Sequence, residues 1–144
     1  MARFVIAEDQ LYLRNLLTMW MTRSGHEVVS VPDGRSGLEC LQAQPADLLI
    51  TDIQMPRMNG VELVRLALAS CPTLRRVFVV TSVCDPNEIL RQLPDPRVRV
   101  FSKPFSPSQL LREVELVVPT QDGPRAAGAA APGMGGPAPM GGGS

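Results

Sequence analysis

Short apolar runs alternate with stretches of helical periodicity along most of this chain. The apolar runs are typical of strands buried in a parallel sheet, and they occupy residues 3–7, 27–31, 47–51, 77–81 and 98–102. Between them, apolar residues recur at helical spacing, as Leu13, Leu16 and Leu17 do. Strands that alternate with helices form βαβ units. The pattern therefore predicts an α/β protein whose mostly parallel sheet is covered by helices on both faces.

Capping and breaking residues mark the ends of two of the predicted helices. Ser106 is placed to cap the last helix, with Gln109 three residues later as its capping-box partner. The fourth helical stretch covers residues 86–93, and Pro94 and Pro96 follow it. Because proline cannot continue a helix, we expect this helix to end early and the next loop to be stiff.

The composition is that of one soluble globular domain. The chain has 144 residues, of which 44% are hydrophobic and 19% are charged. Fourteen basic and fourteen acidic residues cancel, so no net charge draws the chain to nucleic acid or to a membrane surface. The opening apolar run is too short for a signal peptide or a membrane span, which favours a cytoplasmic protein. The three cysteines have no metal-binding spacing and are expected to be reduced thiols.

Composition changes at Pro119. Residues 119–144 are rich in glycine, proline and alanine and contain almost nothing that a core could bury. Such a segment cannot offset the entropy lost on ordering. We therefore expect a folded domain over residues 1–118 and a disordered tail over residues 119–144.

Chemically active side chains follow four of the five predicted strands. Glu8 and Asp9 follow the first strand, Asp52 the third and Lys103 the fifth, while Thr81 ends the fourth. The carboxyl ends of the strands form the binding edge of an open α/β sheet. Three carboxylates without histidine or cysteine suit Mg²⁺, and such an ion would leave one carboxylate free as a nucleophile for a phosphoryl group. The lysine and the threonine would then contact the phosphoryl oxygens.

These residues lie in motifs that resemble the response-regulator receiver domain of two-component signalling. The motifs are "AED" at 7–9, "TDIQMPRMNG" at 51–60, Thr81 after "VFVV", and "KPF" at 103–105. The resemblance extends over residues 3–118. It implies a flavodoxin-like (βα)5 fold, with a doubly wound parallel five-stranded sheet in the order 2-1-3-4-5.

The resemblance also implies roles for the site residues. Asp52 would accept a phosphoryl group from a sensor histidine kinase or a phosphotransfer protein. The implied Mg²⁺ ligands are Glu8, Asp9, Asp52 and the backbone carbonyl of Gln54. Thr81 and Lys103 would hold the phosphoryl group, and a cis peptide before Pro104 would fix the lysine loop. Such a protein is a signalling switch for a downstream protein target, and it catalyses only its own phosphoryl transfer and slow autodephosphorylation.

The chain departs from the family pattern at three places. Glu8 replaces the more usual aspartate. Val100 stands where the family has its switch aromatic, and Phe101 comes one place later. Because side chains alternate along a strand, Phe101 should point to the other side of the sheet. The usual coupling between threonine and aromatic residue is therefore expected to be weak or rerouted. The third departure is the Pro94–Pro96 pair.

Two residues are expected to set the lifetime of a phosphorylated state. Gln54 and Val83 lie two positions after the phosphoacceptor and two after the threonine, where they flank the path of the hydrolytic water. The amide of Gln54 can orient water, but Val83 offers no acid, base or hydrogen bond. We predict a long-lived phosphoaspartate.

The alternatives to a phosphorylatable receiver are a pseudo-receiver scaffold, a Mg²⁺-dependent phosphohydrolase and a DNA-binding protein. A pseudo-receiver scaffold would keep the site but signal without phosphate. A Mg²⁺-dependent phosphohydrolase on a similar sheet commonly needs a second acid two residues after the nucleophile, where this chain has Gln54. DNA binding is disfavoured by the zero net charge and the lack of an appended helix-turn-helix segment.

Outside the site, Trp20 is expected to pack on the core and His26 to lie in a surface turn. A group of arginines is expected to form a solvated basic fringe around the last two strands: Arg75, Arg76, Arg91, Arg97 and Arg99.

Overall fold

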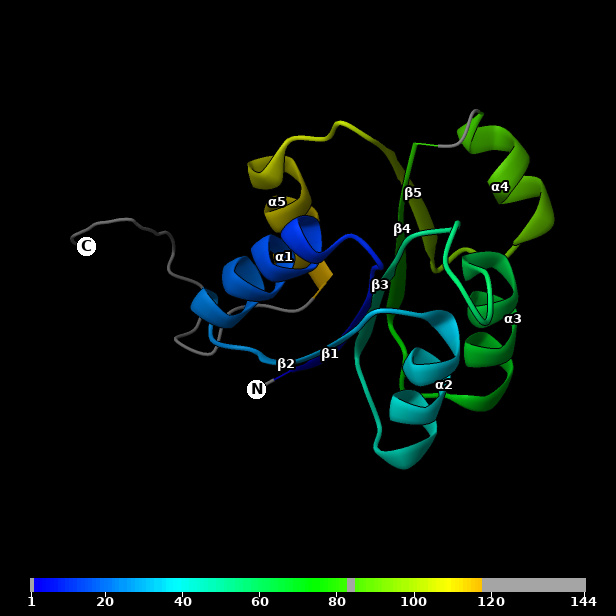
Figure 1. Ribbon diagram of the computed structural model, residues 1–144, viewed down its shortest axis with the longest axis horizontal. Helices are drawn as coiled ribbons and strands as arrows, with labels where there is room; N and C mark the ends of the chain where they lie inside the picture. The colour runs from blue at the N-terminus through cyan, green and yellow to red at the C-terminus, as the bar shows by residue number, and fades with distance from the viewer. Residues whose placement is uncertain (1, 83–84, 118–144) are drawn as a thin grey trace.

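The computed structural model describes residues 2–82 and 85–117. Their elements alternate strictly between strand and helix, as the apolar pattern predicts (Figure 1). The strands are β1 (Arg3–Ala7), β2 (Glu27–Val31), β3 (Leu48–Thr51), β4 (Arg76–Thr81) and β5 (Val98–Ser102). The helices are α1 (Leu11–Arg23), α2 (Gly34–Ala43), α3 (Gly60–Ser70), α4 (Pro86–Gln92) and α5 (Pro107–Val117). The predicted tail and Val83 lie outside the described residues.

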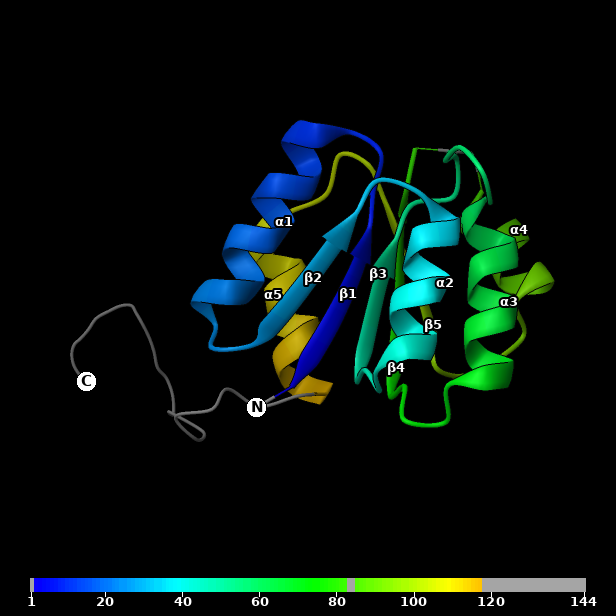
Figure 2. The ribbon, with the colours of Figure 1, turned by 60° about the horizontal axis from the view of Figure 1, so that its bottom comes forward.

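The strands form one parallel sheet in the order β2-β1-β3-β4-β5, which confirms the predicted topology. Helices α1 and α5 cover one face, and α2, α3 and α4 cover the other (Figure 2). Ala7 pairs with Thr51, which pairs with Val79, and Thr81 pairs with Ser102. The carboxyl ends of the strands therefore meet at one edge of the sheet.

The core is divided by the sheet into two apolar clusters. Successive residues of the central strands point to opposite faces, so Leu48 and Ile50 pack towards α1 and α5 while Leu49 packs towards α2, α3 and α4. β3 is buried along its whole length. A strand with helices on both faces cannot alternate apolar and polar residues, which explains its continuous apolar run.

Side-chain caps fix the helix starts that border the site. Asp33 accepts from the N–H of Ser36 at 2.7 Å, and Ser106 accepts from that of Gln109 at 3.4 Å, as predicted. α4 has only seven residues and ends at Gln92, which confirms the early stop before Pro94.

The expectation for His26 is wrong. Its side chain is only 5% exposed, and its ring stacks on Phe4 with 4.5 Å between ring centroids. Gly25, at a φ of 90°, turns the chain so that the next residue folds over the start of β1. Trp20 packs against the cluster beneath α1 and α5, as predicted.

Three of the five arginines expected in a basic fringe near β4 and β5 form ion pairs within the chain, whereas Arg75 and Arg76 donate to backbone carbonyls. Arg91 pairs with Glu88 at 2.6 Å, Arg97 with Asp95 at 2.8 Å and Arg99 with Glu113 at 3.2 Å. The Arg97 guanidinium holds the pKa of Asp95 at about 2 through its hydrogen bonds. In the part of the chain that the structure describes, no helix is long and apolar enough to cross a membrane.

Candidate functional site

The backbone of the two buried acids continues the hydrogen-bonding pattern of the sheet. The N–H of Glu8 donates to the carbonyl of Val31 at 3.0 Å, and that of Asp52 to the carbonyl of Ala7 at 3.0 Å. Both carboxylates therefore stand on rigid backbone just beyond β1 and β3, as the sequence predicts for this edge.

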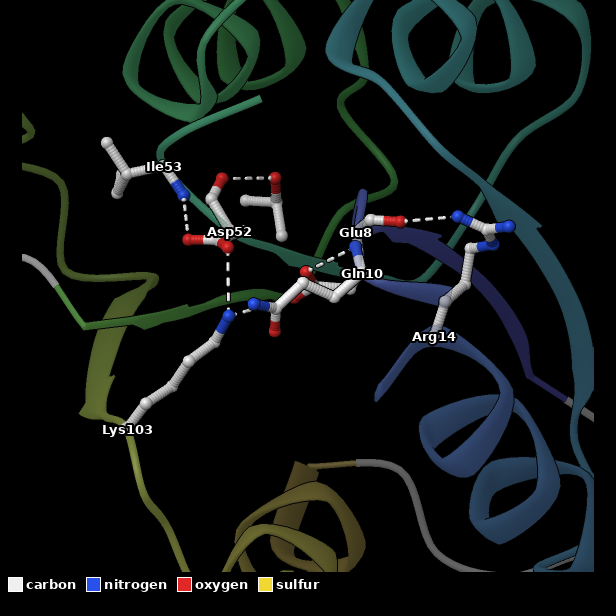
Figure 3. A network of polar contacts seen from close by, with 7 residues as sticks. Glu8, Gln10, Arg14, Asp52, Ile53 and Lys103 are labelled. Carbon is white, nitrogen blue, oxygen red and sulfur yellow. Dashed lines mark hydrogen bonds and ion pairs between the residues drawn. The ribbon is translucent and has the colours of Figure 1, made fainter. Parts of the chain in front are cut away.

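Lys103 joins these two carboxylates. Its Nζ lies 2.9 Å from Oδ2 of Asp52 and 3.3 Å from Oε1 of Glu8 (Figure 3). Its backbone N–H donates to the carbonyl of Thr81 at 2.8 Å, which ties the start of the lysine loop to the end of β4. The Lys103–Pro104 peptide is cis, as the resemblance implies.

Asp52 is held on both sides of its carboxylate. Oδ1 accepts from the N–H of Ile53 at 2.6 Å, while Oδ2 faces Lys103 (Figure 3). Asp52 is only 6% exposed. Gly60 packs so closely behind it that a Cβ there would collide with the Asp52 carbonyl oxygen. The turn after Asp52 consequently requires a glycine at this point.

Glu8 is fully buried, and its oxygen atoms accept hydrogen bonds from residues nearby in the sequence. Its Oε2 accepts from the N–H of Gln10 at 3.1 Å, and its carbonyl accepts from Arg14 at 2.8 Å (Figure 3). Burial raises the pKa of Glu8, and the charge of Asp52 adds to this; the Gln10 N–H and Lys103 oppose the rise.

The pKa of Lys103 is raised above its ordinary value. Burial alone would lower it, but the hydrogen bond and charge of Asp52, together with those of Glu8, outweigh burial. The lysine is therefore held as a cation between the acids.

The donor set at this edge fits a hard divalent cation. Glu8, Asp9 and Asp52 each offer one carboxylate oxygen, and these oxygens lie within 4.8 Å of one another. Asp9 is exposed while the other two are buried, so the cluster opens to solvent on the Asp9 side. An all-oxygen set of this size matches Mg²⁺, which keeps several water ligands. Gln54 lies two residues beyond Asp52, in the loop that leads to α3, with its side chain exposed.

The remaining expected site residues lie on or beside β4 and β5. Thr81 ends β4 and is buried, next to Ser102 on β5. Val100 packs with the cluster beneath α2, α3 and α4. Phe101 packs in the opposite cluster, edge-on to Phe78 with 5.7 Å between ring centroids. The predicted opposite orientation of these two β5 side chains is confirmed.

Sequence reasoning missed one contact that supports the loop after Asp52. Asp33, the N-cap of α2, also lies 3.4 Å from the guanidinium of Arg57, whose φ is 70°. Beside it, a Cβ on Gly34 would collide with the carbonyl oxygen of Met58. The start of α2 therefore packs directly on the loop between β3 and α3. No local sequence pattern indicates this contact, because it joins residues that are distant in sequence.

The fold and the acidic site together define a protein of the flavodoxin-like α/β class with a carboxylate cluster at the carboxyl edge of its sheet. The response regulator receiver domain model matches residues 4–115, and the chain belongs to this family. Response-regulator receiver domains are signalling switches.

Relatives differ in how much of their length this chain covers. The response regulator receiver protein CpdR of Brucella abortus is 36% identical over 122 residues, which are 82% of this chain and 98% of that protein. The transcriptional regulatory protein PdtaR of Mycobacterium tuberculosis is 30% identical over 117 residues, but these are 81% of this chain and 56% of that protein.

Solved structures share the fold. The chemotaxis protein CheY4 of Vibrio cholerae superposes with a TM-score of 0.71 at 26% identity, covering 82% of this chain and 99% of that one. A CheY-like receiver domain protein from Methanospirillum hungatei gives a TM-score of 0.73 at 22% identity, with 81% and 92% covered.

Proposed function

We propose that this protein is a phosphorylatable receiver that takes a phosphoryl group onto Asp52 from a histidine kinase or a phosphotransfer protein. The observation that carries this proposal is the buried Asp52 carboxylate, 2.9 Å from Lys103, beside the carboxylates of Glu8 and Asp9. In the transfer, a carboxylate oxygen of Asp52 attacks phosphorus as the bond to the donor imidazole breaks. The nitrogen keeps the electron pair of that bond.

The residues of the site support an oriented nucleophile. The Lys103 ammonium donates to one carboxylate oxygen of Asp52, and the Ile53 N–H donates to the other. The phosphoryl group would meet the Lys103 ammonium and the Thr81 hydroxyl, which stabilise its oxygens. Glu8, Asp9, Asp52 and the Gln54 carbonyl are the proposed Mg²⁺ ligands. Bound Mg²⁺ would neutralise charge on the phosphoryl oxygens.

The proposed output runs through β4 and β5 to a downstream protein. A new negative charge at Asp52 changes the electrostatic environment of the Lys103 ammonium. The backbone N–H of Lys103 is hydrogen-bonded to the carbonyl of Thr81. Val100 is a small aliphatic residue at the switch position, and Phe101 is packed on Phe78 in the opposite cluster. We therefore assign the response to the Lys103 loop and to Phe101, instead of to an aromatic on the α4 side. Pro104 fixes that loop, and Gln54 and Val83 set the lifetime of the phosphorylated state.

A pseudo-receiver scaffold remains the second candidate because Val100 replaces the switch aromatic. The two candidates differ in a single measurement. Full-length protein and the Asp52→Asn variant are incubated with a small-molecule phosphodonor and Mg²⁺, and their intact masses are compared. Wild type should gain the mass of one phosphoryl group and the variant none. If wild type gains no such adduct while an active receiver does under the same conditions, the scaffold function replaces the proposed one.

A further inference from the structure

The acidic pair Glu8–Asp9 lies just before a helix that has no side-chain cap. Helix α1 begins at Leu11, and its N-cap residue, Gln10, makes no side-chain hydrogen bond to the first turn. The N-cap residues of α2 and α3 do make such a bond. A side-chain cap satisfies free N–H groups and holds the residue before the helix in place. Residues 8–10, which include two of the three clustered carboxylates, therefore depend on other contacts.

Arg14 supplies one of these contacts from within the helix. Its Nη1 donates to the backbone carbonyl of Glu8 at 2.8 Å (Figure 3). The backbone N–H of Arg14 donates to the carbonyl of Gln10 at 2.9 Å. Long side chains in a helix point back towards its N-terminus, which explains how the fourth residue of α1 reaches a residue that precedes the helix.

The Glu8 carbonyl belongs to the peptide group that leads to Asp9. Because a peptide group is planar, the direction of its carbonyl oxygen decides where the next Cα lies. On the other side of Glu8, its N–H donates to the carbonyl of Val31 in β2 at 3.0 Å. The backbone of Glu8 is thus held by β2 through its N–H and by α1 through its carbonyl. The hydrogen bond from Arg14 consequently orients the backbone that carries the Asp9 side chain.

Asp9 depends on its backbone more than the other two acids of the cluster do. The carboxylates of Glu8 and Asp52 accept hydrogen bonds from backbone N–H groups and from Lys103. The Asp9 carboxylate is exposed, and it has no hydrogen-bond or ion-pair partner among residues 2–82 and 85–117. Its place in the cluster is therefore decided by the direction in which the main chain leaves Glu8.

Arg14 forms no ion pair with the acids. Within the described part of the chain, its guanidinium has no carboxylate partner within 4.0 Å. Arg14 therefore occupies no carboxylate oxygen of the cluster. Its charge and its hydrogen bond act in opposite directions on a bound cation. A positive charge beside the cluster repels the cation, whereas the hydrogen bond keeps a ligand in place.

We propose that Arg14 is a positioning residue for the divalent cation. Its hydrogen bond to the Glu8 carbonyl orients the Glu8–Asp9 peptide, so that the Asp9 carboxylate joins those of Glu8 and Asp52. The inference rests on the Mg²⁺ ligands of the proposed function, and it is independent of phosphoryl transfer.

Titration of full-length, chelator-treated protein with Mg²⁺, followed by amide chemical shifts, tests this role. Arg14→Met removes the hydrogen bond and the charge but keeps an unbranched stem. Its dissociation constant for Mg²⁺ should rise roughly tenfold, as is usual when the support of a metal ligand is lost. If Arg14 acted through its charge alone, the constant would fall, because the variant removes a repulsive charge. An equal or lower constant would overturn the proposal.

Two further variants separate the hydrogen bond from the charge and from the helix. Arg14→Lys keeps a positive charge and a donor, so its dissociation constant should stay within about threefold of that of wild type. Arg23→Met is the matched control, because it makes the same change at an exposed position in the last turn of α1. Its dissociation constant should equal that of wild type. Equal weakening in Arg14→Lys and Arg14→Met, or in Arg23→Met and Arg14→Met, would overturn the proposal.

Spectra of the metal-free proteins report the orientation of the peptide directly. Arg14→Met should shift the amide signal of Asp9, since that N–H belongs to the peptide that Arg14 holds. The amide of Ile53, which donates to Asp52, should keep its wild-type position. An unchanged Asp9 amide in the metal-free variant would contradict the positioning role.

Failure of this inference can be told apart from failure of the proposed function. If wild type and Arg14→Met bind Mg²⁺ equally, the positioning role is wrong and the proposed function is unaffected. If Arg14→Met binds Mg²⁺ more weakly but wild type gains no phosphoryl group on Asp52, the positioning role stands and the proposed function is wrong. If wild type does not bind Mg²⁺ at millimolar concentration, the proposed ligands and the positioning role are both wrong.

Discussion

The ammonium of Lys103 bridges the carboxylates of Asp52 and Glu8, at 2.9 Å and 3.3 Å. These three side chains come from the ends of β5, β3 and β1, so one cation links the edge strand β5 to two interior strands. Glu8 is buried, and among the described residues its carboxylate forms an ion pair only with Lys103. Lys103 therefore supplies one positive charge next to two of the three clustered carboxylates.

The pKa of Lys103 should be measurably high and should depend on Asp52. Lys103 is the only lysine in the chain, so ¹³C-methylation of amines gives one lysine signal besides that of the amino terminus. Its pKa should lie above the ordinary lysine value and fall in Asp52→Asn, because the variant removes the largest favourable contact. A lysine pKa equal in both proteins would contradict the bridging geometry.

Mg²⁺ should stabilise the folded protein through the acidic cluster. At a concentration tenfold above the dissociation constant, binding adds about 1.4 kcal/mol to the free energy of unfolding. Urea unfolding with and without Mg²⁺ measures this gain. Asp9→Asn should reduce it, since Asp9 is one of the three clustered carboxylates, whereas Asp122→Asn, beyond the residues that match the receiver-domain model, should not. An equal gain in both variants would place the ion elsewhere.

The free energy of unfolding should decrease in mild acid because His26 is buried. Burial lowers the pKa of this imidazole, with Asp47 acting in the opposite direction, and neither ring nitrogen has a hydrogen-bond partner among the residues that the structure describes. The unfolded chain therefore binds a proton more readily than the native one. The contribution of His26 to the free energy of unfolding is fully present above about pH 6.5, the pKa of histidine in the unfolded chain. It decreases as the pH falls below that value.

The His26→Phe variant separates this contribution from other acid effects. It keeps an aromatic ring for stacking on Phe4 but removes the titration. Between pH 7 and about pH 5, its free energy of unfolding should change less than that of wild type. Parallel curves for the two proteins would show that His26 does not titrate with unfolding.

Gly34→Ala should destabilise the protein and weaken its Mg²⁺ binding. The added methyl would collide with the Met58 carbonyl oxygen, so the loop that carries Gln54 must move, at a cost of about 1–3 kcal/mol. Gly37→Ala, on the same helix, is the control. Its methyl would meet only side chains, at 3.4 Å or more. If both variants bind Mg²⁺ as wild type does, the start of α2 does not position the loop.

Val83→Glu should shorten the lifetime of phosphorylated Asp52. A carboxylate two residues after Thr81 can orient or deprotonate the attacking water, which valine cannot do. Loss of the phosphoryl mass over time, after removal of the phosphodonor, measures the decay rate. An unchanged rate would show that this position does not control hydrolysis here.

The strands, the end of α4 and the start of α5 could be predicted from the sequence because they depend on local patterns. Continuous apolar runs marked β3 and β4 within one residue, and Pro94 marked the end of α4. The opposite orientation of Val100 and Phe101 followed from alternation along a strand. In each case the deciding interaction lies within a few residues along the chain.

The sequence by itself determined the kinds of side chain at the carboxyl edge of the sheet: Glu8, Asp9, Asp52, Thr81 and Lys103 each follow or end a recognisable strand. Only the tertiary structure decided that Lys103 bridges two acids, that Asp33 contacts Arg57 and that His26 is buried on Phe4. These contacts join residues from different βα units. Their geometry depends on how the crossovers pack the helices on the sheet, which no local pattern encodes.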